Sequence, residues 1–371
     1  MPRRTATLLT SALLLITMFC AGALINVPYA EMSPGPTVNT LGVHSGDPVL
    51  KVKNEPGHKG KPKKYDTSGH LNMTTVRVTG SEYRMTLIGA LSGWLRHDSL
   101  VVPYETLYPD DKSAQEVDRE NAEEFTASQE SAKAAALKEL DIPVGTHVLV
   151  GSVEKGAPAH NRLHAGDVIT AVDGTPVGRA ESVAKLVTEH KPGEKVTFTV
   201  IPAAKAKAAQ KQGHKPSAED ARKITVGTRK ASDDGRAVVG IQPAVGHSFP
   251  FEIDIKLADI GGPSAGLMFA LGIVDKLTPT DLTGGKFVAG TGTIEDNGKV
   301  GEIGGIQMKT VGARKQGAEY FLTPAGNCAA AAKDKPDGLT LVKTSSMDDA
   351  LSSLKKIRSG KTDQLTQCKA H

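Results

Sequence analysis

The pattern of hydrophobic and polar positions begins with a long apolar run. No charged residue occurs from Thr5 to Pro28, and this run is long enough to predict a helix that spans a bilayer. Residues 31–70 are rich in Pro, Gly, Lys and Ser, which predicts an extended linker with at most one short strand. The pattern then predicts a strand at 70–78, a short apolar helix at 85–95 and a long, mostly solvated helix at 113–140.

The middle of the chain has the pattern of a small domain with short strands and one amphipathic helix. In that helix, at 181–190, Val183, Leu186 and Val187 share one face. The strands are predicted within 147–153, 191–202 and 223–229. Residues 203–220 are polar and basic but lack the interleaved aromatic residues of a nucleic-acid patch, so we predict a solvated hairpin insertion.

In the last 135 or so residues, strands and helices alternate, which is typical of an α/β domain. One predicted helix, 263–277, is apolar on nearly every side and should be buried. Ser346 followed by Asp349 predicts the start of the last helix. The predicted strands are 238–245, 251–260, 286–294, 319–324 and 339–344, and the other helices are 305–317, 327–334 and 346–357.

Composition excludes several classes of protein. A length of 371 residues suggests two or three domains, and 39% hydrophobic with 23% charged residues excludes a disordered chain or a multi-span membrane protein. The net charge of +4 is too balanced to indicate nucleic acid as a partner. Three cysteines exclude a disulfide-dense scaffold and a cysteine-based zinc cluster, and we expect no metal.

The N-terminus indicates the compartment. Arg3 and Arg4 precede the apolar run, so the N-terminus should stay inside the cell and the rest be exported. A cleaved signal peptide is the alternative, with Ala21-Gly22-Ala23 as its site, but the apolar run continues past that site and favours an anchor. After export, Cys328 and Cys368 could form a disulfide or stay two unrelated thiols.

The candidate chemistry lies in the last domain. The sequence contains no P-loop for ATP and no H-E-x-x-H or G-x-S-x-G motif. In the segment Gly261–Gly266, Pro263 suits the first helical position, so Ser264 would lie in the first turn, where free N–H groups can stabilise an oxyanion. A helix cap is the alternative role for Ser264. Lys309, on a helix near a small apolar face, is the candidate base, because burial favours the neutral amine.

These segments resemble those of Lon-type proteases. Gly262-Pro263-Ser264-Ala265-Gly266 resembles that family's nucleophile segment, and Gly304-Gly305-Ile306-Gln307-Met308-Lys309 the segment of its catalytic lysine. Gly290-Thr291-Gly292-Thr293-Ile294 resembles the strand whose threonine assists the lysine. The resemblance implies Ser264, Lys309 and Thr291 as catalytic residues, with an oxyanion site at Gly262, Pro263 and Ala265.

A second resemblance covers the middle domain. Gly166-Asp167-Val168-Ile169 and Val172-Asp173-Gly174 are similar to the core of a PDZ domain. Its carboxylate-binding loop would fall at 145–148, and a peptide would add as a strand beside 147–153, at Gly145, Val148 and Val150. Anchor, PDZ domain and Lon-type domain in this order resemble the membrane-anchored PDZ–Lon proteases of Gram-positive bacteria.

The resemblance implies an ATP-independent serine endopeptidase without a cofactor, on a single-pass cell-membrane anchor with its catalytic domain outside the cytoplasm. Its substrates would be unfolded or flexible exported polypeptides, and it would assemble as a hexameric ring. The alternative is a non-catalytic, membrane-tethered PDZ adaptor on a degenerate protease fold. The predicted parts are an anchor at 1–30, a linker and wrap region at 31–125, a PDZ domain at 126–234, an α/β Lon-type domain at 235–358 and a tail at 359–371.

Overall fold

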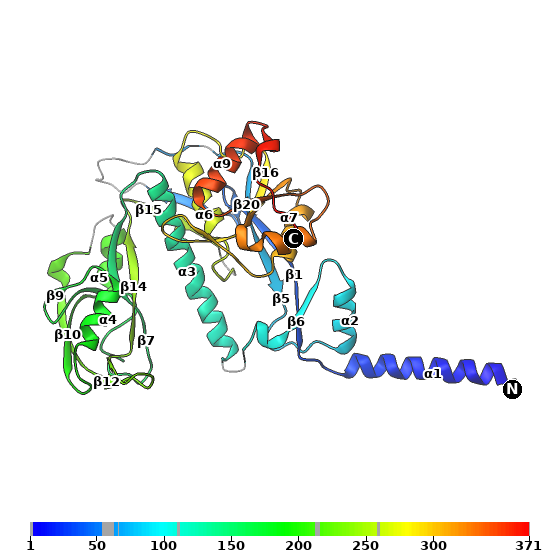
Figure 1. Cartoon of the computed structure of the whole chain (residues 1–371), viewed down its shortest axis with the longest axis horizontal. Helices are drawn as coiled ribbons and strands as arrows, with labels where there is room; N and C mark the ends of the chain where they lie inside the picture. Colours follow the sequence, from blue (N-terminus) through cyan, green and yellow to red (C-terminus); the bar gives the residue numbers. More distant parts are fainter. Residues whose placement is uncertain are drawn as a thin grey trace. The chain divides into compact units, whose positions relative to one another are not determined.

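The chain folds into two compact units (Figure 1). The computed structural model describes residues 3–53, 63–65, 67–109, 112–211, 216–257 and 260–370. Unit 1 consists of Met1–Leu50, Tyr65–Ala136 and Ile255–His371, and unit 2 consists of Lys51–Lys64 and Leu137–Asp254. Each unit is a mixture of helices and strands with its own sheet.

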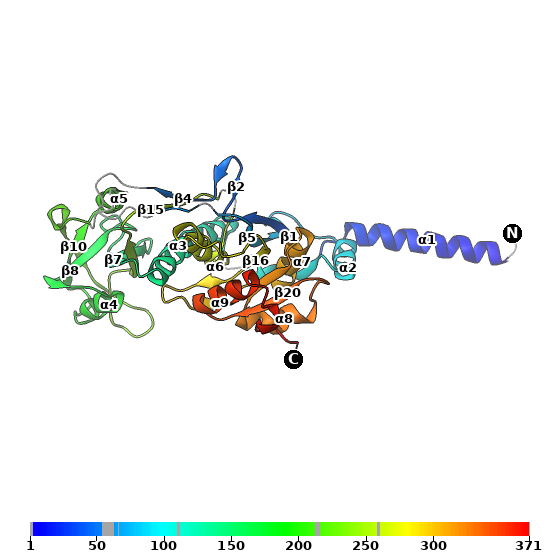
Figure 2. The ribbon, with the colours of Figure 1, turned by 90° about the horizontal axis from the view of Figure 1, so that it is seen from above.

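The N-terminal helix α1 (Arg3–Leu24) has the length and composition to cross a membrane. Its 22 residues extend about 33 Å, close to the thickness of the hydrocarbon layer. Most of its side chains are exposed. In both views the helix runs away from the rest of unit 1, and α2 (Leu87–Leu95) lies at its C-terminal end (Figures 1 and 2).

Six strands form the sheet of unit 1, in the order β20-β19-β16-β5-β1-β6. The four strands from β20 to β5 are parallel, and β1 is antiparallel to both of its neighbours. Apolar side chains on these strands supply much of the core, with Leu71, Val288 and Phe321 fully buried. The strands are β1 (Tyr29–Asn39), β5 (His70–Val78), β6 (Leu100–Pro103), β16 (Phe287–Gly290), β19 (Tyr320–Pro324) and β20 (Thr340–Thr344).

Helices cover this sheet. The apolar helix α6 is buried, as its sequence predicts, and its Phe269 meets Phe125 of α3 edge to face. Helix α7 packs on β1 and β5. The Oγ of Ser346 accepts the N–H of Asp349 at the start of α9, which confirms the predicted cap. The helices are α3 (Ala114–Glu139), α6 (Gly266–Leu277), α7 (Ile306–Lys315), α8 (Cys328–Lys333) and α9 (Met347–Arg358), and the short strands are β2 (Val43–His44), β3 (Asp47–Pro48), β17 (Thr293–Ile294) and β18 (Val300–Gly301).

Unit 2 contains a sheet in the order β11-β10-β8-β7-β14, with β9 beside β8. Helix α4 inserts Val183 and Val187 into its core next to Phe198, on the predicted apolar face. The elements are β7 (Gly145–Val153), β8 (Val168–Val172), β9 (Thr175–Pro176), α4 (Ala180–Thr188), β10 (Lys195–Ile201), α5 (Ala203–Lys211), β11 (Arg222–Gly227), β12 (Arg229–Lys230), β13 (Ala237–Val238) and β14 (Ile241–Ser248), with β4 (Leu50–Lys53) and β15 (Glu252–Ile255) as a separate pair.

The predicted linker at 31–70 is wrong in its first part. Residues 29–39 form β1, an 11-residue strand inside the sheet of unit 1. The sequence Pro34-Gly35-Pro36 hides this strand, because proline cannot donate to a ladder. The pairing of β1 with β5 shifts register between Pro34 and Thr37, so an irregularity accommodates the prolines. Residues 54–62 and 66 of the predicted linker lie outside the described residues.

Two further predictions fail on local structure. The expected hairpin at 203–220 begins as helix α5, because an Ala- and Lys-rich stretch favours a helix more than a hairpin. Residues 212–215 are outside the description. The strand expected at 251–260 is only β15, Glu252–Ile255, and residues 258–259 are also not described.

The strand pairing also differs from the predicted domain limits. Strand β14 was expected in the protease domain that starts at 235, but it pairs with β7 along the whole of β7 and lies in unit 2. Strands β1, β5 and β6, expected in the wrap region, are part of the sheet of unit 1. Polarity patterns identify a strand but not its partner, and a partner distant in sequence decides the domain.

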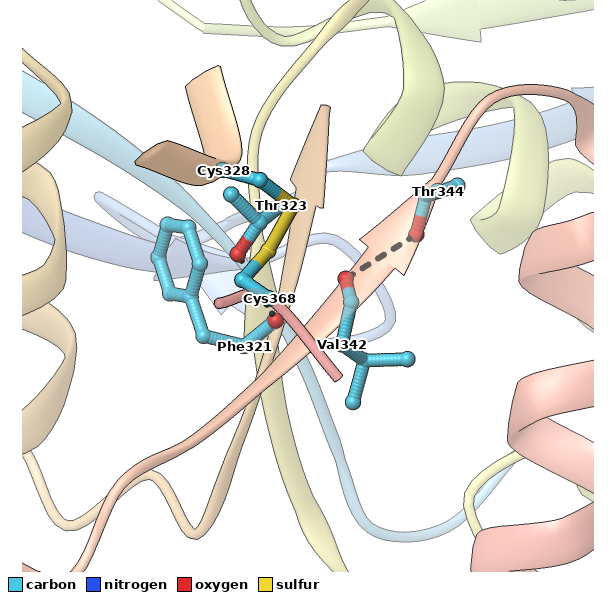
Figure 3. The surroundings of a disulfide bond; sticks show 6 residues. All are labelled: Phe321, Thr323, Cys328, Val342, Thr344 and Cys368. Carbon is cyan, nitrogen blue, oxygen red and sulfur yellow. Dashed lines mark hydrogen bonds between the residues drawn. A yellow bond between two sulfur atoms is a disulfide. The ribbon is translucent and has the colours of Figure 1, made fainter. Parts of the chain in front are cut away.

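A disulfide joins Cys328, at the start of α8, to Cys368 in the C-terminal tail, with 4.9 Å between their Cα atoms (Figure 3). The tail follows β20 closely, since the N–H of Cys368 donates to the carbonyl of Leu341 at 3.0 Å. The bond therefore holds the tail against the edge strand of unit 1.

Removing this bond should destabilise unit 1. The disulfide closes a loop with a sequence separation of 40 residues. On the chain-entropy model, Cys368→Ser should therefore lower the free energy of unfolding by about 4 kcal/mol. Thermal unfolding of the full chain checks this. Cys20→Ser, which changes the free and exposed thiol on α1, should leave the melting temperature unchanged. Equal melting temperatures for Cys368→Ser and the unaltered chain would contradict the expectation.

Candidate active site

Ser264 lies just before α6 rather than within its first turn. The helix begins at Gly266, its N-cap is Ala265, and no side chain caps it. Pro263 is thus not the first helical residue, and the alternative role of Ser264 as a cap is wrong. The preceding Gly262 has φ +80°, a conformation that favours glycine. This turn leaves the Ser264 hydroxyl uncommitted to the helix.

Lys309 lies within hydrogen-bonding distance of that hydroxyl. It projects from α7, whose N-cap, Gly305, has φ +68° and lies so close to Val76 that a Cβ would be 2.8 Å from its Cγ1. The Lys309 side chain is only 2% exposed. Its Nζ donates to Ser264 Oγ at 2.6 Å and to Thr291 Oγ1 at 3.0 Å. Burial lowers the pKa of Lys309 to about 7.

Thr291 fixes the geometry of both partners. It follows β16 directly and is fully buried. Its Oγ1 donates to the carbonyl of Ser264 at 2.9 Å, and the N–H of Gly292 donates to the same carbonyl at 2.9 Å. Because the hydroxyl hydrogen of Thr291 is engaged there, its lone pairs face Lys309. The arrangement anchors the Ser264 backbone and directs the amine towards Oγ.

Of the three residues predicted for the oxyanion site, the structure leaves one as a possible donor. Pro263 has no N–H to donate, and the N–H of Gly262 already donates to the carbonyl of Asn121 at 2.9 Å. These two predictions are therefore wrong as donors. Within the described part of the chain, the N–H of Ala265 donates to no protein acceptor. Ala265 is therefore the candidate that remains.

A cavity of about 330 Å³ opens in front of Ser264 and Lys309. Its walls include residues that the sequence analysis missed, namely Pro36 of β1 and Thr75, Val76 and Arg77 of β5. The alternation of 70–78 predicts the strand, but its position beside Ser264 depends on sheet order. Beyond Met73, the last β5 residue paired with β16, no described strand pairs with β5 on that side.

The predicted peptide site on β7 is wrong. Strand β7 is an interior strand, with β8 on one side and β14 on the other. Val148 and Val150 are fully buried in the core of unit 2, and Gly145 pairs with Ser248 of β14. No peptide can add beside 147–153 without displacing a strand. The open edge next to α4 belongs to β14.

Two family models match the chain. Residues 118–210 match a PDZ domain, and residues 258–355 match the Lon protease (S16) C-terminal proteolytic domain. The second match contains Ser264, Thr291 and Lys309. The first ends before β11 and β14, two strands of the sheet of unit 2.

Curated relatives match only part of the chain. Lon protease 1 of Bacillus subtilis is 30% identical over 119 residues, which cover 30% of this chain and 15% of the relative. Lon protease of Mesomycoplasma hyopneumoniae is 41% identical over 66 residues, 18% of this chain and 7% of the relative. The chain thus spans less than a sixth of the length of either relative.

Among solved structures, the PDZ domain of an SdrC-like protein from Listeria monocytogenes matches with 24% identity, 26% of this chain, 87% of that chain and a TM-score of 0.20. The corresponding domain from Listeria innocua matches with 25% identity, 26% of this chain, 90% of that chain and the same TM-score of 0.20. From the family models, this chain carries a PDZ domain followed by the C-terminal proteolytic domain of the Lon (S16) proteases, behind an N-terminal helix that could cross a membrane.

Proposed function

We propose that the chain is an ATP-independent serine endopeptidase in which Ser264 is the nucleophile and Lys309 the base. The observation that carries the proposal is the 2.6 Å separation of Lys309 Nζ and Ser264 Oγ, with the lysine buried and its pKa about 7. A large fraction of the amine is then neutral at physiological pH and able to accept a proton. The test is cleavage of unfolded casein by the purified full chain without ATP, compared with Ser264→Ala.

The proposed reaction has two halves. Lys309 takes the proton from Ser264 Oγ as that oxygen attacks the peptide carbonyl, and the N–H of Ala265 stabilises the oxyanion. Lys309 then gives the proton to the leaving amine, which departs and leaves an acyl group on Ser264. Lys309 then takes a proton from water, which attacks this ester, and returns the proton to Ser264 Oγ as the carboxylic acid product leaves. Thr291 is a positioning residue, because it holds both the amine and the Ser264 carbonyl.

The substrate is proposed to be an unfolded or flexible polypeptide. The unpaired side of β5 beyond Met73 borders the cavity, and an extended chain could pair there so that its carbonyl reaches Ser264. The sequence has no P-loop, so an ATP-driven unfolding step is not part of the proposal.

The proposed location is a membrane surface outside the cytoplasm. Helix α1 would be the anchor, and Arg3 and Arg4 before it favour an inside N-terminus. The Cys328–Cys368 disulfide supports an oxidising compartment for unit 1. Assembly into a ring stays a prediction from the resemblance.

The PDZ domain is proposed to bind the substrate along β14. This strand is the open edge of the sheet beside α4, and its Val245 side chain is half exposed. Pro243 within it is tolerated because an edge strand can lack a donor. The loop that enters β14 through Val239 and Gly240 would take the place of the carboxylate-binding loop predicted at 145–148.

Hydrogen exchange tests this edge. In the full chain with Ser264→Ala, which binds without cleaving, saturating unfolded casein should slow exchange in peptides that cover β14. Peptides from the solvent-exposed surface at 229–236 serve as the control and should not change. The expected protection should weaken in a second variant with Val245→Asp. Unchanged exchange throughout 239–248 would overturn the proposed edge.

A further inference from the structure

Helix α2 has two apolar faces that adjoin. Ala90 and Gly93 are buried inside unit 1, so one face, made of small residues, packs against the fold. The neighbouring face carries large apolar side chains in the solvent, at the spacing of one helical face. We name them the α2 stripe: Leu87, Leu91, Trp94 and Leu95, which are 36%, 48%, 57% and 85% exposed.

Backbone hydrogen bonds hold the start of α2 against the segment that follows α1. The N–H of Leu87 donates to the carbonyl of Ile25 at 2.9 Å, and the N–H of Val27 donates to the carbonyl of Met85 at 2.9 Å. Gly22 is buried in the last turn of the otherwise exposed α1, where a Cβ would lie 3.1 Å from Ile88 Cγ1. A small residue thus permits the close approach of the two helices.

These contacts set the depth of α2 relative to a bilayer. Gly22 lies two residues, or about 3 Å, before the end of α1. Where α1 spans the hydrocarbon layer, α2 lies at the level at which α1 leaves it (Figures 1 and 2). An exposed apolar stripe at that level faces lipid rather than water.

We propose that α2 is an interfacial helix that lays the α2 stripe on the boundary between lipid headgroups and acyl chains. Trp94 has the amphipathic ring that prefers this boundary, and Tyr29 holds the ring edge to face at 5.8 Å. Arg84 and Arg96 lie on either side of α2 and are both exposed. Arg96 already pairs with Asp98 at 3.1 Å and with Glu31 at 3.6 Å, so Arg84, beside the Tyr104 ring, is the cation proposed to meet headgroup phosphates. Apolar burial supplies the attraction, and Arg84 adds to it on anionic lipid.

The consequence is a fixed orientation of the protease unit on the membrane. A single spanning helix would let that unit rotate and tilt relative to the membrane, whereas a second contact through α2 fixes its orientation. Strand β1 follows α1, β6 follows α2, and Pro36 of β1 lines the cavity in front of Ser264. The docked helix would therefore hold the cavity at a constant distance from the surface. This inference rests on the proposed insertion of α1 but not on the proposed catalysis.

Trp94 is the sole tryptophan of the chain, so its fluorescence reports on α2 alone. The full chain is reconstituted into vesicles of phosphatidylcholine and phosphatidylglycerol whose acyl chains are brominated near the headgroup or near the chain end. We expect shallow bromine to quench most of the emission and deep bromine to quench less. The double variant Leu91→Gln, Leu95→Gln should be quenched several-fold less while still floating with the vesicles.

Val43→Gln is the matched control, because it removes an apolar side chain that is 67% exposed on another part of unit 1. It should be quenched like the unaltered chain. Emission that bromine does not quench, in a chain that floats with the vesicles, would overturn the proposal. So would emission that shifts with protein concentration but not with bromine, because a second copy would then cover the stripe. A chain that does not float would overturn it as well, whatever its protease activity.

Discussion

Ser264→Ala is expected to slow the cleavage of unfolded casein by at least ~10⁴-fold, because binding and oxyanion contacts alone leave little catalysis without the nucleophile. The substitution removes one oxygen atom from a half-buried position that caps no helix, so the fold should be retained. The measurement is the initial rate of casein cleavage without ATP, with the melting temperature as the check on folding.

Ser359→Ala is the matched control for this result. Ser359 is exposed at the end of α9, far in sequence from the cavity residues, and its loss should not change the rate. Cleavage that persists in Ser264→Ala would remove the serine from the mechanism. A folded chain that never cleaves, with or without Ser264, would favour the non-catalytic PDZ adaptor.

The second large effect is the dependence on pH. With a pKa of about 7 for Lys309, the neutral fraction of its amine rises about tenfold between pH 6 and pH 8. We expect kcat/KM for an unfolded substrate to rise by a similar factor and then level. Lys309→Arg should be inactive over this range, since a guanidinium stays protonated. A rate that falls between pH 6 and pH 8 would contradict a lysine base.

The same pKa also makes stability depend on pH. The pKa of Lys309 is lower in the folded chain than its ordinary value of 10.5, so the unfolded chain binds more protons between about pH 7 and pH 10. Its contribution to stability therefore rises with pH in that window, and below it the buried charge destabilises the fold. Lys309→Met should be inactive yet more stable than the unaltered chain at pH 7. A lower melting temperature for this variant would contradict the expectation that the buried charge of Lys309 destabilises the fold.

The sequence predicts the candidate site better than its surroundings. Ser264, Thr291 and Lys309 lie in three short motifs, and in the structure Lys309 Nζ is within hydrogen-bonding distance of both hydroxyls. Gly262 fails as an oxyanion donor for a reason no local pattern contains, since its N–H is taken by Asn121 of α3, more than a hundred residues earlier. The same limit applies to β5, which lines the cavity only through its place in the sheet.

For the fold as well, local patterns predict the elements but not their distant partners. Elements with a strong period or composition, such as α3, α6 and α9, are predicted nearly to their ends. Strand β1 is missed because Pro34 and Pro36 cannot donate backbone hydrogen bonds to a neighbouring strand, and only the irregular pairing with β5 accommodates them. Strand β14 is predicted as a strand but in the wrong unit, because its partner β7 lies about a hundred residues earlier. Because β14 pairs with β7, the proposed peptide-binding edge is β14 rather than β7.

We propose Ser264 as a nucleophile that Lys309 activates. The most direct measurement is covalent labelling of the full chain with a fluorophosphonate, followed by mass spectrometry of its peptides. We expect one adduct, on Ser264, that forms faster as the pH rises through about 7 and is largely lost in Lys309→Met. An unlabelled Ser264, or labelling at a rate that neither pH nor Lys309→Met changes, would contradict it.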